Sequence, residues 1–146
     1  TVRTLAGDMR ELELGTDSHD IVLAAATLHH LRSDDEWHAM FAKIFAALRG
    51  GGSFWIFDLI EHRTPAIQAL MKRRYGEYLV SLRASAAEGA AYRDDVFAYI
   101  EREDTPRSLE YQMGLLEETG FVGVEVLHKN GLFAAFGARK AAGVKR

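Results

Sequence analysis

One stretch of the chain, residues 20–31, joins an apolar segment to a polar end. After the charged Asp20, residues 21–26 are apolar without alternating with polar ones, which is typical of a strand buried on both faces of a parallel sheet. Two adjacent histidines, His29 and His30, follow directly. We therefore expect a central strand whose carboxyl end carries polar side chains.

The segment after the histidines predicts a helix. Ser33 is expected to be its N-cap, with Glu36 reaching back from the third helical position as in a capping box. Apolar residues then recur at steps of three and four positions, which places them on one helical face: Trp37, Met40, Phe41, Ile44, Phe45 and Leu48. The glycines at 50–52 are expected to end the helix before a second buried strand at 53–58. Strand, helix and strand form a βαβ unit with parallel strands.

Weaker patterns flank this unit. Residues 2–6 are expected to form a short strand that Gly7-Asp8 interrupts. A Thr-Pro pair at 64–65 predicts a helix start, and apolar spacing continues that helix to Arg83. Between Arg83 and Ala91 the pattern fades, so we expect a loop or a short break before a helix over 92–100.

The last part of the chain predicts a helix followed by a hairpin. A second Thr-Pro pair at 105–106 repeats the start signal. Gly120 is expected to close this helix as a left-handed C-cap, with Phe121 as the hydrophobic contact just beyond it. Residues 122–127 and 132–138 are expected to pair as antiparallel strands across a turn at 129–131.

Polar residues gather where such a sheet would bind a ligand. In open parallel sheets, ligands lie outside the carboxyl ends of the strands, and here those ends carry Thr27, His29, His30 and Asp58. A metal site built from His29, His30, Asp58 and His62 is conceivable. Its spacing matches no standard metal-binding set, so no metal is predicted.

Composition narrows the class of protein. The 146 residues suffice for one domain with a core, and the net charge of -3 gives no argument for nucleic-acid binding. The chain has no cysteine, which suits a cytoplasmic protein, and no apolar run long enough to span a membrane. It begins with Thr, so we expect an upstream portion to be missing. Residues 140–146 are expected to form a solvated tail rather than a nucleic-acid arm.

Several short motifs occur in a recognisable order: 6–9 (Ala-Gly-Asp-Met), 19–23 (His-Asp-Ile-Val-Leu), 28–31 (Leu-His-His-Leu), 48–52 (Leu-Arg-Gly-Gly-Gly) and 118–121 (Glu-Thr-Gly-Phe). In order and spacing they resemble the carboxyl-terminal part of a class I S-adenosylmethionine-dependent methyltransferase domain. The resemblance covers most of residues 1–139. It implies an α/β fold: a doubly wound, Rossmann-like sheet with a closing antiparallel hairpin, in which residues 64–104 form a helical lid insertion. The insertion looks most like the branch near carboxy-S-adenosylmethionine synthase.

One departure from the family concerns the sheet. The family's strands lie in the order 3-2-1-4-5-7-6, and its glycine-rich cofactor loop follows the first strand. This sequence supplies the family's strands 3 to 7, and the family's first two strands are absent from it. Three explanations stay open: an upstream part is missing, the family's third strand docks abnormally, or another chain fills the gap.

The resemblance assigns cofactor-binding roles to three residues. Asp8 would accept a hydrogen bond from the adenine amino group, and the backbone N–H of Met9 would meet a ring nitrogen. The carbonyl of Ala25 would receive the ammonium group of S-adenosylmethionine, at the end of the central strand. No metal belongs to this set.

The catalytic and substrate-binding candidates lie elsewhere on the same edge. His29 and His30 are the catalytic candidates, because an acceptor that carries a proton needs a base and histidine titrates near neutral pH. Asp58, Arg74 and Tyr75 are the substrate-binding candidates. Leu115 stands where carboxy-S-adenosylmethionine synthases hold an arginine, which favours ordinary methyl transfer.

We therefore expect S-adenosylmethionine-dependent methyl transfer to a small-molecule acceptor, without a membrane or nucleic-acid partner. The apolar face of the lid would serve a homodimer. The alternative is a non-catalytic dimerising or scaffold protein derived from this fold, which the missing cofactor loop favours. A nicotinamide-dependent oxidoreductase with a similar sheet is less favoured, because the antiparallel closing hairpin suits methyltransferases better.

Overall fold

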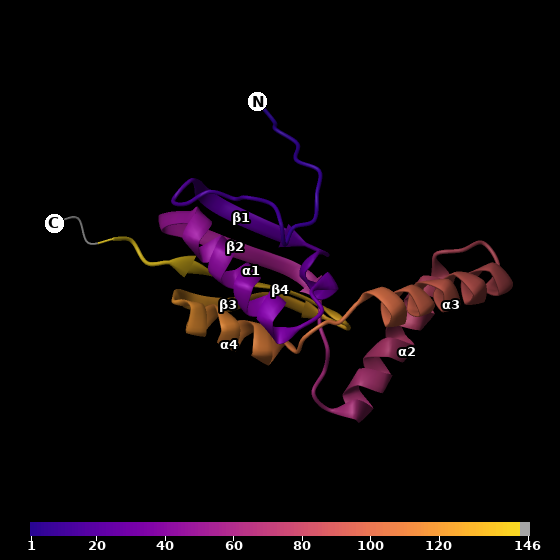
Figure 1. The fold of residues 1–146 in the computed structure, drawn as a ribbon. Helices are drawn as coiled ribbons and strands as arrows, with labels where there is room; N and C mark the ends of the chain where they lie inside the picture. Colours follow the sequence, from indigo (N-terminus) through magenta and orange to yellow (C-terminus); the bar gives the residue numbers. More distant parts are fainter. Residues whose placement is uncertain (144–146) are drawn as a thin grey trace.

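The computed structural model describes residues 1–143 and contains one four-stranded sheet with helices packed on one face (Figure 1). The strands are β1 (His19–Ala25), β2 (Leu48–Leu59), β3 (Phe121–Asn130) and β4 (Phe133–Lys140). The helices are η1 (Leu28–His30), α1 (Asp34–Ala47), α2 (Pro65–Ser81), α3 (Ala86–Glu103) and α4 (Leu109–Thr119).

The sheet has the order β1-β2-β4-β3. β1 and β2 are parallel, and their ends coincide because Ala25 pairs with Phe57. β4 is antiparallel to both β2 and β3. The predicted βαβ unit and closing hairpin are therefore confirmed. This order is also the one that the resemblance implies for the family's strands 4-5-7-6.

The core lies between α1, α4 and one face of the sheet. Trp37 and Phe41 of α1 are fully buried, as are Phe54 of β2 and Phe136 of β4. The rings of Phe41 and Phe54 meet edge to face at 5.6 Å. The apolar spacing that predicted α1 thus identified the face that packs on the sheet.

The opposite face of the sheet has no helical layer within residues 1–143 (Figure 1). Side chains alternate along β1, so Val22 packs toward the core while Ile21 and Leu23 point away from it. Ile21 is 60% exposed, Leu23 73% and Phe57 45%. A face this apolar normally carries a covering layer or a partner.

The helices α2 and α3 form an antiparallel hairpin that extends beyond the carboxyl ends of β1 and β2 (Figure 1). They pack closely at Gly89, where a Cβ atom would lie 2.5 Å from the carbonyl oxygen of Val80. The loop between α2 and α3 is shorter than the predicted stretch from Arg83 to Ala91, because α3 begins at Ala86. Ser85 caps it by accepting a hydrogen bond from the backbone N–H of Glu88 at 3.3 Å. Within residues 1–143, no helix is both long and apolar enough to cross a bilayer.

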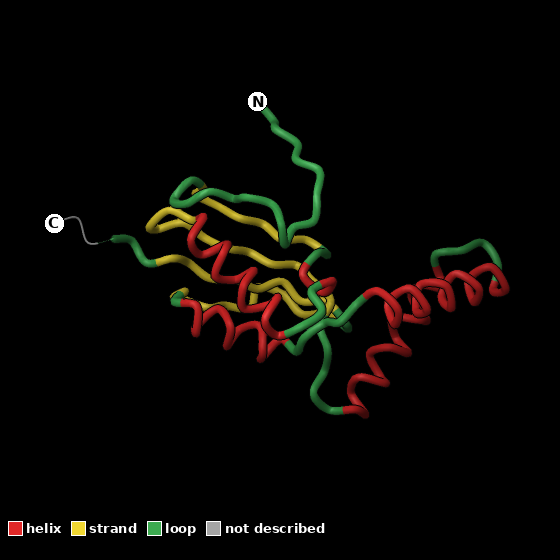
Figure 2. Tube along the Cα trace, in the orientation of Figure 1, coloured by secondary structure: helices red, strands yellow, loops and turns green. Residues whose placement is uncertain are grey.

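The predicted strand at 2–6 is wrong, because this segment is coil (Figure 2). A strand needs a neighbour for its backbone hydrogen bonds. In the family's order, the strand at this position does not neighbour the strand that corresponds to β1.

The end of α1 and the start of α4 also differ from the prediction. α1 ends at Ala47, and β2 begins at Leu48, so the glycines at 50–52 lie inside the strand rather than ending the helix. At Gly52 a Cβ atom would lie 2.9 Å from the carbonyl oxygen of Asp20, so the close approach of β1 explains a glycine there. α4 begins at Leu109 with Ser108 as its cap, not at the Thr-Pro pair 105–106.

The capping signals were partly right. Ser33 Oγ accepts a hydrogen bond from the backbone N–H of Glu36 at 3.2 Å, as expected. The Glu36 carboxylate accepts from the backbone N–H of Arg32 rather than from that of Ser33, so the reciprocal half of the capping box is wrong. Gly120 has φ of 106°, which confirms the left-handed C-cap of α4.

Candidate functional site

The candidate site begins where β1 and β2 end side by side. After β1 the chain turns at Ala26, a non-glycine residue with φ of 50°, whose backbone N–H donates to the carbonyl of Phe57 at 2.8 Å. This left-handed conformation is uncommon for alanine and is often found at functional sites. The turn leads into η1, which carries both histidines. Their position beside the end of β2 therefore follows from the parallel pairing.

A buried carboxylate organises this turn. Asp58 is fully buried at the end of β2. Its Oδ2 accepts from the backbone N–H of Leu28 at 2.7 Å and of Thr27 at 3.3 Å. Its Oδ1 accepts from the backbone N–H of Leu59 at 2.7 Å and forms a short hydrogen bond with Nδ1 of His29. With its proton on Nδ1, neutral His29 keeps the lone pair on Nε2.

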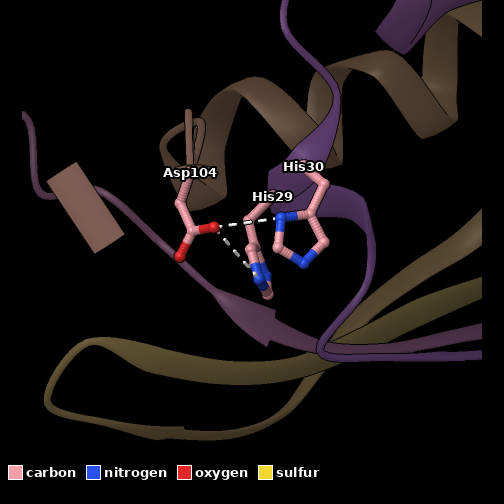
Figure 3. A group of neighbouring side chains, drawn as sticks. All are labelled: His29, His30 and Asp104. Carbon is pink, nitrogen blue, oxygen red and sulfur yellow. Dashed lines mark ion pairs between the residues drawn. The ribbon is translucent and has the colours of Figure 1, made fainter. Parts of the chain in front are cut away.

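A second carboxylate, Asp104, faces both histidines (Figure 3). Its Oδ1 lies 3.0 Å from Nδ1 of His30 and 3.7 Å from Nε2 of His29. The next residue ties this segment to the histidine turn, because the backbone N–H of Thr105 donates to the carbonyl of His29 at 2.7 Å and its hydroxyl to that of Leu31 at 2.5 Å. The segment that follows α3 is thus anchored on the turn.

These neighbours shift the protonation of His29. Burial by itself lowers the pKa of this imidazole. The hydrogen bond and negative charge of Asp58, together with the charge of Asp104, outweigh burial and raise the pKa above its ordinary value. A histidine with a raised pKa is a stronger proton acceptor near neutral pH.

The residues His29, His30 and Asp104 also form the metal-ligand set available among residues 1–143, with ligating atoms all within 4.8 Å of one another. Two imidazoles and one carboxylate could hold a divalent ion such as Zn²⁺. His62, which the sequence suggested as a ligand, lies apart, because its Nε2 is 2.8 Å from the carbonyl oxygen of Gly131. The direct contacts of Asp104 with the two rings account for the cluster without an ion.

The three predicted cofactor-binding residues lie on the same edge of the sheet in two segments. Asp8 and Met9 form a turn next to Arg10, whose guanidinium pairs with Asp8 at 2.6 Å and with Glu36 of the first turn of α1 at 2.8 Å. The hydrogen bonds from Arg10 hold the pKa of Asp8 down to about 2. Ala25 ends β1, and its carbonyl accepts from the hydroxyl of Thr27 at 2.8 Å.

The predicted substrate-binding residues separate into two places. Arg74 and Tyr75 of α2 line a cavity of about 480 Å³ together with Phe57, Met71, Tyr78, Asn130, Gly131, Leu132 and Phe133. Asp58 faces the histidine turn instead, so it positions His29 and lines no cavity with them. Burial, with smaller effects from Tyr92 and Tyr78, raises the pKa of Tyr75.

A smaller cavity of about 210 Å³ is bordered by Asp104, and Leu132 lines both this cavity and the one at Arg74 and Tyr75. Sequence reasoning missed Asp104, because 74 residues separate it from His30 and nothing local marks its contact with the histidines. The only sequence signal is an acidic residue directly before the Thr-Pro pair at 105–106.

Comparison with known proteins identifies the fold. Residues 1–56 match the family model described as a methyltransferase domain. Human N-acetylserotonin methyltransferase, solved with S-adenosylmethionine, is similar over 94% of this chain and 33% of its own, at 18% identity and a TM-score of 0.59. The S-adenosylmethionine-dependent methyltransferase SibL is similar over 95% of this chain and 36% of its own, at 20% identity and a TM-score of 0.62.

The chain has the class I methyltransferase fold. A phosphoethanolamine N-methyltransferase from Haemonchus contortus shares it over 92% of this chain and 36% of its own, at 15% identity and a TM-score of 0.58. No curated protein matches the sequence.

The resemblance to S-adenosylmethionine-dependent methyltransferases is thereby confirmed, while the branch near carboxy-S-adenosylmethionine synthase stays a prediction. The chain spans about a third of the length of these three structures.

Proposed function

We propose that this chain takes part in S-adenosylmethionine-dependent methyl transfer to a small-molecule acceptor, with His29 as the general base. The observation that carries the proposal is the buried pair of His29 and Asp58 at the carboxyl edge of a methyltransferase sheet. A general base needs a fixed orientation and a free lone pair, and this pair supplies both.

The donors and acceptors on this edge fit the cofactor. The Asp8 carboxylate and the Met9 N–H suit the amino group and ring nitrogen of adenine, and the Ala25 carbonyl keeps a second lone pair for an ammonium group. S-adenosylmethionine, when bound, supplies an electrophilic methyl group. In an in-line transfer, orientation of the two reactants supplies much of the rate.

The protein's own contribution is the movement of a proton. An acceptor hydroxyl or amine must lose its proton as it is methylated, and Nε2 of His29 would take it. Asp58 holds the ring by Nδ1, and Asp104, at 3.7 Å from Nε2, stabilises the imidazolium that forms. His30 lines the approach, with its ring centroid 4.3 Å from that of His29.

The cavity at Arg74 and Tyr75 supports a small-molecule acceptor, because its volume of about 480 Å³ is that of a typical small-ligand site. It shares the lining residue Leu132 with the smaller cavity, which Asp104 borders, and Asp104 lies 3.7 Å from Nε2 of His29. The names of two similar proteins, an N-acetylserotonin methyltransferase and a phosphoethanolamine N-methyltransferase, also point to small acceptors.

Isothermal titration calorimetry with S-adenosylmethionine tests the proposal in a protein whose sheet is completed by a glycine-rich strand–turn–helix segment before residue 1. We expect saturable binding that Asp8→Ala weakens about tenfold, by loss of an adenine hydrogen bond. Asp20→Ala, at the opposite end of β1, is the matched control. No binding by the folded, completed protein would refute the cofactor assignment. The 146-residue chain alone is expected to bind weakly or not at all.

One observation favours the alternative, a non-catalytic dimerising or scaffold protein. Ile21, Leu23 and Phe57 form an exposed apolar surface on the uncovered face of the sheet. A partner could cover this surface without any transfer reaction. Absence of S-adenosylmethionine binding in the calorimetry would favour it. The homodimer and the cytoplasmic location stay predictions.

A further inference from the structure

The cavity at Arg74 combines aromatic walls with a single positive charge. The rings of Phe57 and Phe133 are stacked at 5.8 Å, with 14° between their planes. Tyr75 meets Phe133 edge to face at 5.5 Å. Two parallel rings favour a flat aromatic ligand that continues their stack, because offset stacking adds to the burial of apolar surface.

The charge of this cavity is not balanced by the protein. None of its nine lining residues is acidic, and Arg74 is the one cation among them. Of the nearby cations, Lys72 pairs with Glu101 at 2.5 Å and Arg93 pairs with Asp94 at 2.8 Å, whereas Arg73, which lines a different cavity, has no ion pair among residues 1–143. Arg74 forms no ion pair with any residue of the described range 1–143. An arginine without a partner at a cavity wall is available for an anionic ligand.

The guanidinium group suits an oxyanion such as a carboxylate, because its planar fork can donate two parallel hydrogen bonds. The amide of Asn130 lies on the same cavity wall and can add a neutral donor. A cationic ligand, which aromatic cages otherwise attract, is disfavoured by the charge of Arg74.

We infer that the acceptor is a planar aromatic carboxylate, with its ring against Phe57 and Phe133 and its carboxylate on Arg74. As an identification of the acceptor this rests on the proposed methyl transfer, whereas the binding itself does not. The ring fills the cavity at Arg74, and for methyl transfer the reacting substituent would lie on the side of Leu132, the residue that this cavity shares with the smaller cavity at Asp104.

Binding of simple probes to the 146-residue chain tests the inference without S-adenosylmethionine. Benzoate, benzyl alcohol, benzylamine and cyclohexanecarboxylate are titrated by calorimetry at neutral pH. We expect benzoate to bind at least about tenfold more tightly than the other three, since a charged hydrogen-bonded pair and ring stacking each contribute that much. Arg74→Gln should weaken benzoate about tenfold and leave benzyl alcohol unchanged.

The matched control is Arg73→Gln, because Arg73 is adjacent on α2 but lines a different cavity, with Lys72 and Arg93. It should leave benzoate binding unchanged, and far-ultraviolet circular dichroism should show that both variants fold. No benzoate binding, equal binding of benzoate and benzyl alcohol, or an equal loss in Arg73→Gln would overturn the inference. Failure of S-adenosylmethionine binding in the completed protein would refute the methyl transfer alone and leave a carboxylate site.

Discussion

Replacing Asp58 by Asn is the sharpest single perturbation of this structure. The side chain keeps its size, but its charge is lost and one of its two acceptor oxygens becomes an N–H donor. Four donors converge on the carboxylate: the backbone N–H groups of Thr27, Leu28 and Leu59, and Nδ1 of His29. An amide at this fully buried position can accept from only one side.

The expected loss of stability follows from that geometry. The new NH₂ group faces one of the two donor pairs, so two buried donors lose their acceptor. Removing one partner of a buried, hydrogen-bonded charge pair costs about 3–5 kcal/mol. At roughly 3 °C per kcal/mol for a domain of this size, Asp58→Asn should lower the melting temperature by about 9–15 °C.

Urea unfolding followed by tryptophan fluorescence measures this loss, since Trp37 is buried in the core. The matched control is Asp20→Asn: Asp20 begins β1 at its other end, and its side chain is 78% exposed in an ion pair with Arg49. That exposed pair contributes under about 1 kcal/mol. A free energy of unfolding for Asp58→Asn within about 1 kcal/mol of the unchanged protein would contradict the structural role of Asp58.

Two further predictions concern pH and packing. Because Asp58 and Asp104 raise the pKa of His29 in the folded state, their contribution to stability is fully present below the unfolded pKa of about 6.5 and is lost as pH rises through the folded pKa. Urea midpoints measured across this range should fall with rising pH, and His29→Gln should flatten the curve; the same slope in both proteins would contradict this reasoning. Gly137→Ala should destabilise by about 1–3 kcal/mol, because its Cβ atom would lie 2.2 Å from the carbonyl oxygen of Phe54 and 2.5 Å from the Trp55 ring. Gly114→Ala, with nothing within 4 Å, should stabilise α4 by up to about 1 kcal/mol, and similar thermal shifts in the two variants would be inconsistent with the packing at Gly137.

The parts of the fold that the sequence predicted well are those fixed by local patterns. The apolar spacing in α1 reflects burial that a single element carries, and the unbroken apolar run predicted the strand β1. Gly120 was predictable for the same reason, because a left-handed C-cap selects glycine directly. These signals gave the βαβ unit and the closing hairpin without any knowledge of the partners in space. The predicted burial of β1 on both faces is wrong, because Ile21 and Leu23 are exposed on the uncovered face of the sheet.

The errors occur where distant residues decide the local structure. Thr105 looks like a helix cap, but its hydroxyl and its backbone N–H are used by the carbonyls of Leu31 and His29. The helix α4 therefore starts later, at Leu109. Residues 2–6 form no strand, since strand formation requires a neighbour that these residues lack. Neither feature can be predicted from local sequence propensity, because each depends on residues that are distant in the sequence.

The same limit applies to the candidate site. Asp58 and the histidines were predictable together, because parallel strands bring their carboxyl ends to one edge. Arg74 and Tyr75 were predicted to bind the substrate from their place in the predicted lid. They line one cavity, and their role in binding stays a prediction. Asp104 could not be found, because its contact with the histidines depends on how the chain returns from α3 to the sheet.

The two carboxylates around His29 differ in a way that separates folding from chemistry. Asp58 accepts from three backbone N–H groups as well as from the imidazole, so a loss of activity in its variants would mix misfolding with loss of the base. Asp104 Oδ1 is buried and makes no hydrogen bond within residues 1–143; its neighbours are the two imidazole rings. A change at Asp104 therefore alters the charge beside Nε2 while leaving the turn that Asp58 holds intact. Any role of His29 as a base should be judged on Asp104 variants first, because only there does a change in rate report on the proton rather than on the fold.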